Sequence, residues 1–399
     1  MLMVPIERLV PGMMIAAPIL HPLRPATHLV QCGVKLTSEL ITRAAELKVR
    51  QAWIKHPLLE DLDGMLLSKL PERRRHIYET VKGGFDELQH RAITTEDYHR
   101  YAAVIGALIT ELLGRDSKVG EIAERLFNES DELSGHCANV AYLTVTVGLH
   151  LENQIVRERS RTVEPHVAQD LTSLGVGAML HDIGKLQGPP EVRRQHETMV
   201  KRHADYPLHV LTGWQMLRHR VSPVATAVVL HHHQRWDGSG WPDMRELTHG
   251  RHVGGLAGRK THIFPRIVAA ANLFDNLTTR PNGVFRPAIF ALHAMQHEPY
   301  LSRLDPIVLD AFLRYIPPFP TGSEVVLNDG RLAAVIGMNA AQPCRPTVRI
   351  LEDEDYVEEI PLAQRPELAI QRAVGVVVSQ WLYDLPPRYV SLTAAAQGR

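Results

Sequence analysis

The feature that most constrains the fold is a predominantly helical pattern from about residue 72 to residue 316. Apolar residues recur there at spacings of three and four, as in AAVIGALITELLGR, HCANVAYLTVTVGLHL and TSLGVGAMLHDIGK. This period places them along one face of an α-helix. Strands and helices do not alternate in this region, and no internal repeat is visible. The pattern therefore predicts an all-α bundle rather than a parallel sheet flanked by helices.

Smaller units are expected on both sides of the bundle. Before it, MMIAAPIL, HLVQCGVKL and QAWIKH predict short strands, and TSELITRAAELKV predicts a helix capped by Thr37 or Ser38. After it, EVVLNDGRLAAVIG predicts a hairpin and TVRILED a further strand. The expected fold is mainly α, with these parts: a small N-terminal α+β unit at 1–70, a helical domain at 72–316, a small β appendage at 317–362 and a C-terminal tail at 363–399.

Composition excludes several classes of partner. Lys and Arg together number 44, as do Asp and Glu, so no overall charge attracts DNA, RNA or an anionic membrane. The three cysteines, Cys32, Cys137 and Cys344, lie far apart and form no CxxC motif, which favours a reducing compartment without structural disulfides. No run approaches the roughly 18 apolar residues of a membrane span, and no signal peptide is recognisable. We therefore expect a cytoplasmic protein.

Histidine is the compositional outlier, with 22 residues in 399. Three of them, His231 to His233, run directly into the turn sequence DGSGWP. On a helix, adjacent side chains such as His232 and His233 diverge by about 100°. We therefore expect these two imidazoles to bind neighbouring metal ions rather than to chelate one ion together.

The motif HDIGK carries the strongest metal-binding signal. His181 and Asp182 can bind one ion together, and the second carboxylate oxygen can bridge to another. Such a pair also occurs by chance, but other candidate ligands lie in the same helical region. Glu132 and His136 are four residues apart and so project from one helix face, although an exposed polar pair would have the same spacing.

A further histidine, His209, begins the helical segment HVLTG, in which Gly213 would allow close packing. Together, five histidines with a Glu and an Asp in one helical region predict a metal centre. Mixed imidazole and carboxylate ligands suit iron, manganese, nickel or zinc, and the lack of nearby cysteine argues against a structural zinc site.

These segments resemble the HD-GYP family, which are bacterial metal-dependent phosphodiesterases of the HD superfamily that act on cyclic di-GMP. His136, HDIGK, HVLTG, HHHQRWDGSGWP and AANLFDNLTTRP occur in the order and approximate spacing of the family. The resemblance covers about 120–315. The N-terminal unit and TGSEVVLNDGRLAAVI also resemble segments that flank HD-GYP domains. The resemblance implies an HD-type helical bundle.

The resemblance also implies a centre of two or three divalent ions, with iron or manganese ahead of nickel, zinc and magnesium. Its ligands would be Glu132, His136, His181, Asp182, His209, His232, His233 and the residue at position 272, Asn272. Asp182 would be the bridging ligand. Glu132 matches the extra carboxylate of family members that hold three metals.

On the substrate side, the family implies cyclic di-GMP as the ligand, cleaved to pGpG with GMP as a further product. Asp182 and Lys185 would be catalytic, and the Lys185 ammonium would face the scissile phosphate and offset its charge. Arg280 resembles the family arginine that grips the ligand phosphate. The remaining residues expected at the substrate are Asp237, Gly238, Gly240 and Trp241.

Three positions depart from the family pattern. Gln234 stands in place of a Glu, which removes a charge and keeps hydrogen-bonding capacity. Trp241 replaces the Tyr of the GYP triplet, retaining a flat ring and an N–H donor. Asn272 replaces the Asp that is ordinarily a terminal metal ligand, so one site is expected to be weakened. Asp275, three residues further on, is expected to support another side chain or the helix rather than to bind metal.

Two other functions remain open. A catalytically weak family member could act as a cyclic di-GMP receptor or dock a protein partner through the WDGSGWP loop, and Asn272 favours this alternative. A phosphohydrolase acting on mononucleotides is the third candidate, and DGSGWP argues against it. Residues 1–70 could regulate, pack or support a homodimer.

Overall fold

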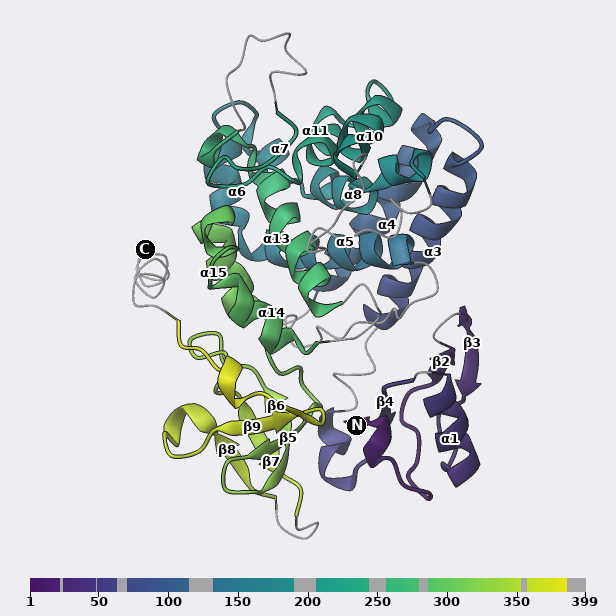
Figure 1. The fold of residues 1–399 in the computed structure, drawn as a ribbon, viewed down its shortest axis with the longest axis vertical. Helices are drawn as coiled ribbons and strands as arrows, with labels where there is room; N and C mark the ends of the chain where they lie inside the picture. Colours follow the sequence, from purple (N-terminus) through teal and green to yellow (C-terminus); the bar gives the residue numbers. More distant parts are fainter. Residues whose placement is uncertain are drawn as a thin grey trace.

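The structure is a computed structural model in which two small units lie beside a helical domain (Figure 1). It describes residues 1–21, 24–47, 49–62, 70–114, 132–189, 206–243, 256–279, 286–352 and 357–385. The mainly α fold expected from the periodicity is confirmed. Within the described part of the chain, no helix has both the length and the hydropathy needed to cross a membrane.

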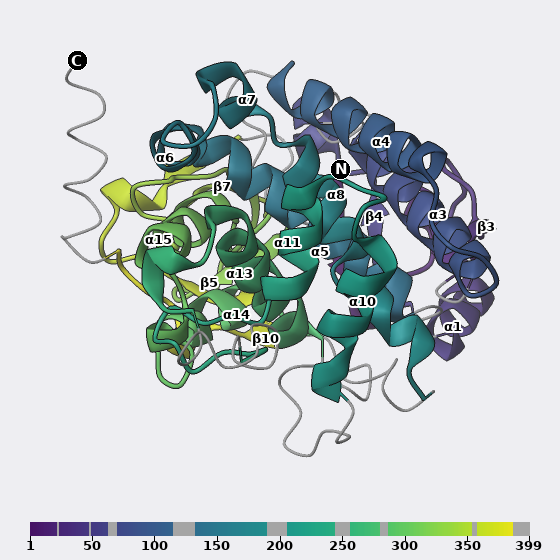
Figure 2. The same ribbon diagram turned by 90° about the horizontal axis from the view of Figure 1, so that it is seen from above.

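The helical domain is built around α5, which packs against α3, α8 and α13. The helices are α3 (Leu70–Leu88), α4 (Thr95–Leu113), α5 (Glu132–His150), α6 (Glu152–Arg159), α7 (Pro165–Gln169), α8 (Thr172–Leu180), α10 (His209–Leu217), α11 (Pro223–His231), α13 (Ile263–Thr278), α14 (Ala288–Met295) and α15 (Pro306–Tyr315). Short 3-10 helices between them are η4 (Ile183–Gln187), η5 (Tyr206–Leu208), η6 (Gly258–Lys260) and η7 (Leu301–Arg303). Figure 2 shows α5 passing beneath α8 and α11 in the middle of the domain.

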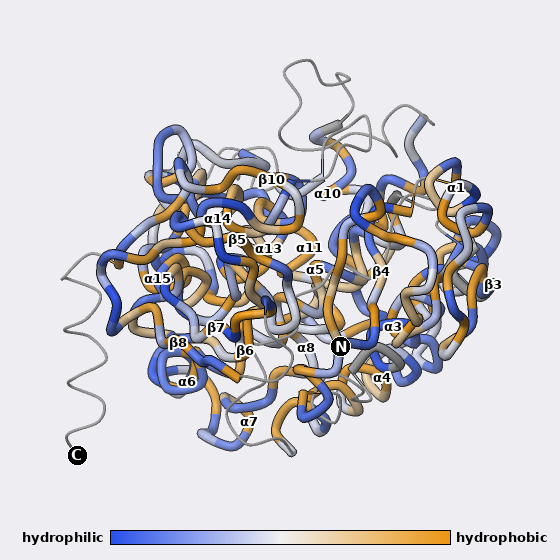
Figure 3. Tube along the Cα trace, turned by 90° about the horizontal axis from the view of Figure 1, so that it is seen from below, coloured by the Kyte–Doolittle hydropathy of each residue, from blue (hydrophilic) through white to orange (hydrophobic). Residues whose placement is uncertain are grey.

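Helix α8 is buried on all sides, and small residues allow this. Every residue from Leu174 to Leu180 is buried, as expected for a helix with no polar face. A Cβ on Gly175 would lie 2.5 Å from the Ile105 side chain of α4, and one on Gly177 would lie 2.7 Å from Val228 of α11. The trace in Figure 3 shows the same contrast, hydrophobic around α11 and α13 and hydrophilic along the peripheral α6.

Among the described residues, the N-terminal unit contains two antiparallel strand pairs and the helix α1. Its elements are β1 (Leu2–Pro5), η1 (Ile6–Arg8), β2 (Ile19–His21), β3 (Arg24–Val30), α1 (Ser38–Glu46), β4 (Gln51–Ile54) and η2 (Pro57–Leu59), with β1 paired to β4 and β2 to β3. Thr37 is the N-cap of α1, since its side chain accepts a hydrogen bond from the Leu40 N–H. Only the first part of the predicted strand HLVQCGVKL, residues 28–30, lies in β3, because the chain turns at Gly33 with φ of 82°.

The C-terminal unit is a six-stranded antiparallel sheet in the order β10-β9-β5-β6-β7-β8. Its elements are β5 (Glu324–Leu327), β6 (Leu332–Gly337), β7 (Thr347–Ile350), β8 (Glu359–Pro361), η8 (Leu362–Gln364), β9 (Ile370–Ala373), β10 (Val376–Val377) and η9 (Ser379–Trp381). The predicted hairpin is β5–β6, and the predicted further strand is β7. The sheet also continues past residue 362 into the expected tail. Strand β9 joins β5 there, helped by Asn328, which accepts from the Ala369 N–H and donates to the Glu367 carbonyl.

The two terminal units are joined to each other, a contact for which the sequence carries no signal. The Met3 N–H donates to the Gly322 carbonyl at 2.8 Å. Ala334 and Leu351 of the sheet belong to the same apolar cluster as the N-terminal strands. Arg349 of β7 is buried and donates to both carboxylate oxygens of Asp61, at 2.7 and 2.8 Å, and to the Leu58 carbonyl. Segments almost 300 residues apart in the chain therefore share one core.

Replacing Arg349 tests this junction. Arg349→Leu should lower the free energy of unfolding by about 1–3 kcal/mol, because the Leu58 carbonyl and the Asp61 carboxylate lose their buried donor. The matched control is Arg331→Leu, whose side chain is 28% exposed against 8% for Arg349; its cost should stay below about 1 kcal/mol. Chemical denaturation measures both. Equal costs would show that the Arg349 contacts do not stabilise the junction.

Candidate metal centre

Two groups of ligand-type side chains meet at Asp182. The first group, called site A, consists of Asp182, His209, His232 and His233. The second group, called site B, consists of His136, His181 and Asp182. Within each group, one potential ligand atom per residue lies within 4.8 Å of all the others. Every member is buried. Five histidines, from α5, α10 and the ends of α8 and α11, thus converge on one carboxylate.

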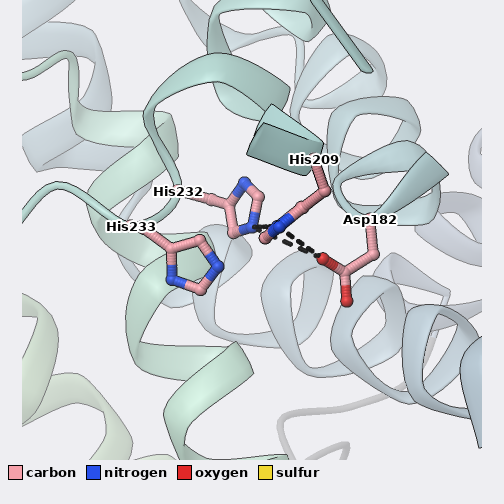
Figure 4. A group of neighbouring side chains, drawn as sticks. All are labelled: Asp182, His209, His232 and His233. Atoms are coloured by element: carbon pink, nitrogen blue, oxygen red, sulfur yellow. Dashed lines mark hydrogen bonds and ion pairs between the residues drawn. The ribbon is translucent and has the colours of Figure 1, made fainter. Parts of the chain in front are cut away.

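Site A faces the Oδ1 atom of Asp182. The Nε2 atom of His209 lies 3.0 Å from Oδ1, and that of His232 lies 3.7 Å from it. The two Nε2 atoms are 3.5 Å apart. Figure 4 shows the His209 and His232 rings directed at the carboxylate, with His233 beside them. Two ligands that are each about 2.1 Å from a metal ion are separated by roughly 3.0–3.4 Å in common geometries, so these spacings suit a shared ion.

Site B faces the other carboxylate oxygen. The Nε2 atoms of His181 and His136 lie 3.5 and 3.6 Å from Asp182 Oδ2. They are 3.2 Å from each other. One carboxylate therefore serves both groups through different oxygens, as a bridging ligand does.

Two helix ends orient the imidazoles. His181 follows the last residue of α8, and its Nδ1–H donates to the Ala178 carbonyl at 2.8 Å. His232 follows the last residue of α11 and donates in the same way to the Val229 carbonyl at 2.9 Å. Carbonyls at a helix C-terminus lack intrahelical donors and can only accept. Both Nε2 lone pairs therefore face the centre.

The protonation states suit metal binding. Burial lowers the pKa of His181 and of His233 well below the ordinary value and lowers that of His209 to about 4. Burial alone would raise the pKa of Asp182, but the Lys185 ammonium and the neighbouring imidazoles hold it well below its usual range. Neutral imidazoles around an ionised carboxylate are the donor set that a divalent ion requires. The residues present therefore fit such an ion.

Glycine contacts set the distance between His209 and Asp182. A Cβ on Gly184 would lie 1.9 Å from the His209 carbonyl oxygen and 2.6 Å from the Gly213 nitrogen. A Cβ on Gly213 would lie 2.8 Å from Val229. The close packing predicted at Gly213 is therefore present, and it brings the start of α10 against η4.

Lys185 lies against the carboxylate. It is 3% exposed, and its Nζ donates to Asp182 Oδ2 at 2.6 Å. The resemblance placed this ammonium at the scissile phosphate. In the structure it neutralises the oxygen that faces site B, so any charge that it lends to a phosphate is shared with Asp182.

The DGSGWP loop supports site A. The Trp241 ring stacks on the His233 ring at 3.9 Å between centroids and meets His209 edge to face at 5.5 Å. One indole face is therefore occupied by a ligand-type side chain rather than left for a base or a partner. A Cβ on Gly240 would lie 2.5 Å from the His233 carbonyl oxygen, so the loop approaches the histidine backbone closely.

Two other loop residues shape the turn. Asp237 is exposed, and its Oδ1 accepts from the Ser239 N–H at 2.8 Å. Gly238 has φ of 80°, a conformation that favours glycine.

Gln234 uses both ends of its amide. It is 3% exposed, its Nε2 donates to the Pro242 carbonyl at 2.7 Å, and its Oε1 accepts from the Leu256 N–H at 3.2 Å. A carboxylate could accept here but not donate. The departure from the family Glu therefore has a structural reason in this chain.

Helix α13 carries the remaining expected positions. Asn272 is buried, and its Oδ1 accepts from Asn276 Nδ2 at 2.7 Å. Asp275 Oδ2 accepts from His136 Nδ1 at 2.7 Å, so Asp275 supports another side chain as expected. Glu132 begins α5. The Glu132 side chain and Arg280 lie outside the described residues.

Sequence reasoning missed Asn139. Its Nδ2 donates to Asp275 Oδ1 at 3.1 Å, so it completes a chain of contacts from α5 to α13 and back. The available signal was its spacing of three residues from His136, which places both on one helix face.

Comparisons with known proteins agree with this geometry. Residues 147–308 match the family described as HD domain, and residues 324–376 match the KOW domain associated with HD domain. The cyclic di-GMP phosphodiesterase PA4108 of Pseudomonas aeruginosa is 28% identical over 184 residues, 44% of this chain and 40% of that protein. The cyclic di-GMP phosphodiesterase response regulator RpfG of Xanthomonas campestris is 31% identical over 157 residues, 37% of each chain.

Two further similarities extend the comparison. The 3'3'-cGAMP-specific phosphodiesterase 1 of Vibrio cholerae is 29% identical over 171 residues, 40% of this chain and 34% of that protein. Among solved structures, an HDG"Y"P protein of Bdellovibrio bacteriovorus, Bd1817, covers 77% of this chain and 97% of its own at 14% identity, with a TM-score of 0.43. The chain spans less than half the length of the curated relatives described here.

Residues 147–308 therefore match the HD domain family, and the described residues include buried His and Asp clusters suited to metal ions. The curated relatives are named phosphodiesterases of cyclic dinucleotides, and the motifs around the clusters are similar to those of the HD-GYP family.

Adding one methyl group at Gly184 should disturb site A. Gly184→Ala forces α10 away from η4, because the new Cβ would meet backbone atoms. We expect a loss of about 1–3 kcal/mol in the free energy of unfolding, together with lower metal content by elemental analysis. Gly106→Ala on α4 is the control, since its Cβ meets nothing within 4 Å. It should stabilise the protein by about 0.5–1 kcal/mol. Similar behaviour of both variants would contradict the packing argument.

Placing the glutamate of the family pattern at position 234 should destabilise the folded protein. Gln234→Glu removes the donor to the Pro242 carbonyl and sets two acceptors against each other, so stability should fall by about 1–3 kcal/mol. Gln296→Glu is the control, because Gln296 is only half-buried and donates to a single helix carbonyl. Urea denaturation compares the two. An unchanged midpoint for Gln234→Glu would show that the amide is not required.

Proposed function

We propose that this protein is a metal-dependent phosphodiesterase that hydrolyses cyclic di-GMP to pGpG. The observation that carries the proposal is the convergence of histidine Nε2 atoms on both oxygens of the single buried carboxylate Asp182. The names of the relatives support the substrate class, because all of those described above that carry an activity are phosphodiesterases of cyclic dinucleotides. Cleavage of pGpG to GMP would be a second phosphodiester hydrolysis of the same kind.

Ions bound at sites A and B would supply Lewis-acid polarisation of a phosphate and a water molecule that is easily deprotonated. Asp182 holds the two sites at a set separation, because each of its oxygens faces a different histidine group. The ends of α8 and α11 hold the rings in one tautomer, so no proton has to move before a ligand binds. For the ions we propose iron or manganese, which accept mixed imidazole and carboxylate ligands.

Lys185 would act on the charge of the reacting phosphate. Its Nζ already lies beside the shared carboxylate and is excluded from water. An ammonium in such a dry site offsets negative charge on phosphoryl oxygens more strongly than it would in water. Lys185 therefore couples the charge of the substrate to that of the bridging ligand.

A second candidate function is a cyclic di-GMP receptor without turnover. Asn272 favours it, because a neutral amide stands where the family has a carboxylate ligand. The Asn272 Oδ1 also already accepts a hydrogen bond from Asn276. An amide oxygen engaged in this way is a poorer metal ligand than a carboxylate.

Incubation of purified, manganese- or iron-loaded protein with cyclic di-GMP separates the two functions. We expect release of pGpG, lost on chelation and restored by metal. His181→Ala should lower the rate by at least about 1,000-fold, because site B loses a ligand. His166→Ala, an exposed histidine of α7, should match the wild type. Tight binding of cyclic di-GMP by the metal-loaded protein without any product would instead establish the receptor.

A further inference from the structure

Asp275 of α13 lies between two side chains of α5, behind site B. Its Oδ2 accepts from His136 Nδ1 at 2.7 Å, and its Oδ1 accepts from Asn139 Nδ2 at 3.1 Å. All three residues are buried: Asp275 is 3% exposed, His136 is 8% exposed and Asn139 is 4% exposed. The opposite side of the His136 ring points at site B, with Nε2 3.2 Å from His181 Nε2.

The amide of Asn139 shows that Asp275 acts as an acceptor. Within the described residues, the Asn139 Oδ1 is buried and has no hydrogen-bond partner. Turning the amide over would point oxygen at oxygen, so Asp275 Oδ1 is the acceptor in the observed orientation. An ionised carboxylate can only accept, so Oδ2 accepts from His136 Nδ1. With the ring proton on Nδ1, His136 presents its Nε2 lone pair to site B.

The end of α13 uses the Asp275 backbone: the hydroxyls of Thr278 and Thr279 both donate to the Asp275 backbone carbonyl. The Asp275 carboxylate, by contrast, contacts His136 and Asn139 of α5.

Among the described residues, site B has one carboxylate, Asp182. It is shared with site A, and the oxygen that faces site B also binds the Lys185 ammonium at 2.6 Å. Asn272 contributes no charge. A carboxylate bonded to a ligand imidazole increases the basicity of that ligand, so Asp275 adds negative charge to site B through His136.

We propose that Asp275, held by Asn139, is a positioning residue for site B: it fixes the tautomer of His136 and supplies through that ring the negative charge that Asn272 lacks. The inference rests on the proposed metal centre, but not on turnover, because a receptor that binds metal would need the same charge.

Manganese binding tests the charge. Two Mn²⁺ ions bridged by Asp182 give a spin-coupled spectrum in electron paramagnetic resonance, whereas site A alone gives an isolated-ion spectrum. In Asp275→Asn, the coupled spectrum should require about 10–100-fold more Mn²⁺ than in the wild type, while the first ion binds as before. Asp310→Asn is the control, because it removes another carboxylate of the helical domain that is paired with Arg314 instead. Wild-type Mn²⁺ binding by Asp275→Asn would overturn the proposal.

A double variant tests the link to Asn272. Asn272→Asp should strengthen the second Mn²⁺ site. The double variant Asn272→Asp/Asp275→Asn exchanges one carboxylate for another. Because the two changes share one site, its affinity for the second Mn²⁺ ion should return to within about threefold of the wild type. Strictly additive effects would mean that Asp275 does not compensate for Asn272.

Nitrogen NMR of histidine-labelled, metal-free protein tests the tautomer, with His136→Gln to assign the signal. His136 should carry its proton on Nδ1 in the wild type and in Asp275→Asn, whose amide oxygen still accepts, but not in Asp275→Leu. If His136 keeps the same tautomer in Asp275→Leu, Asp275 has only a packing role, and the proposal that it positions His136 is wrong. Failure of the proposed function looks different: two Mn²⁺ ions bind as expected and no pGpG appears.

Discussion

The arrangement of the helical domain depends on one buried carboxylate. Asp182 is 1% exposed, and isolation of an ionised carboxylate from water is very unfavourable unless positive charge and donors surround it. Here Lys185 contacts one oxygen and His209 contacts the other. Burial lowers the pKa of His181, His209 and His233, so these imidazoles supply little positive charge of their own. A divalent ion is the partner that such a set of groups lacks.

Helix ends do much of the positioning. His181 and His232 stand one residue beyond α8 and α11, where free carbonyls take their Nδ1 protons, and His209 begins α10. Gly184 and the loop residue Gly240 let these ends approach closely. The same apolar helices that make the core therefore also set the directions of His181, His209 and His232.

Away from the centre, the chain closes on itself. The N-terminal strands and the C-terminal sheet share apolar residues and the buried Arg349. Since the helical domain lies between these two units in the sequence, both of its ends are tied to one body (Figure 1). Loop-closure entropy makes such a contact costly to form, and a buried guanidinium with several acceptors helps to offset it.

The sequence by itself determined the helical class, the hairpin β5–β6, and the set of histidines and carboxylates, because periodicity and residue type are local properties. It also placed Asp275 behind the centre rather than in it. Only the tertiary structure decided that Lys185 contacts Asp182, that Trp241 covers His233, that Gln234 needs its amide, and that Asn139 takes part. These facts depend on which side chains from distant segments become neighbours when the core packs. The short strand β9 was lost for the same reason: its four residues carry too little pattern until the distant strand β5 lies beside them.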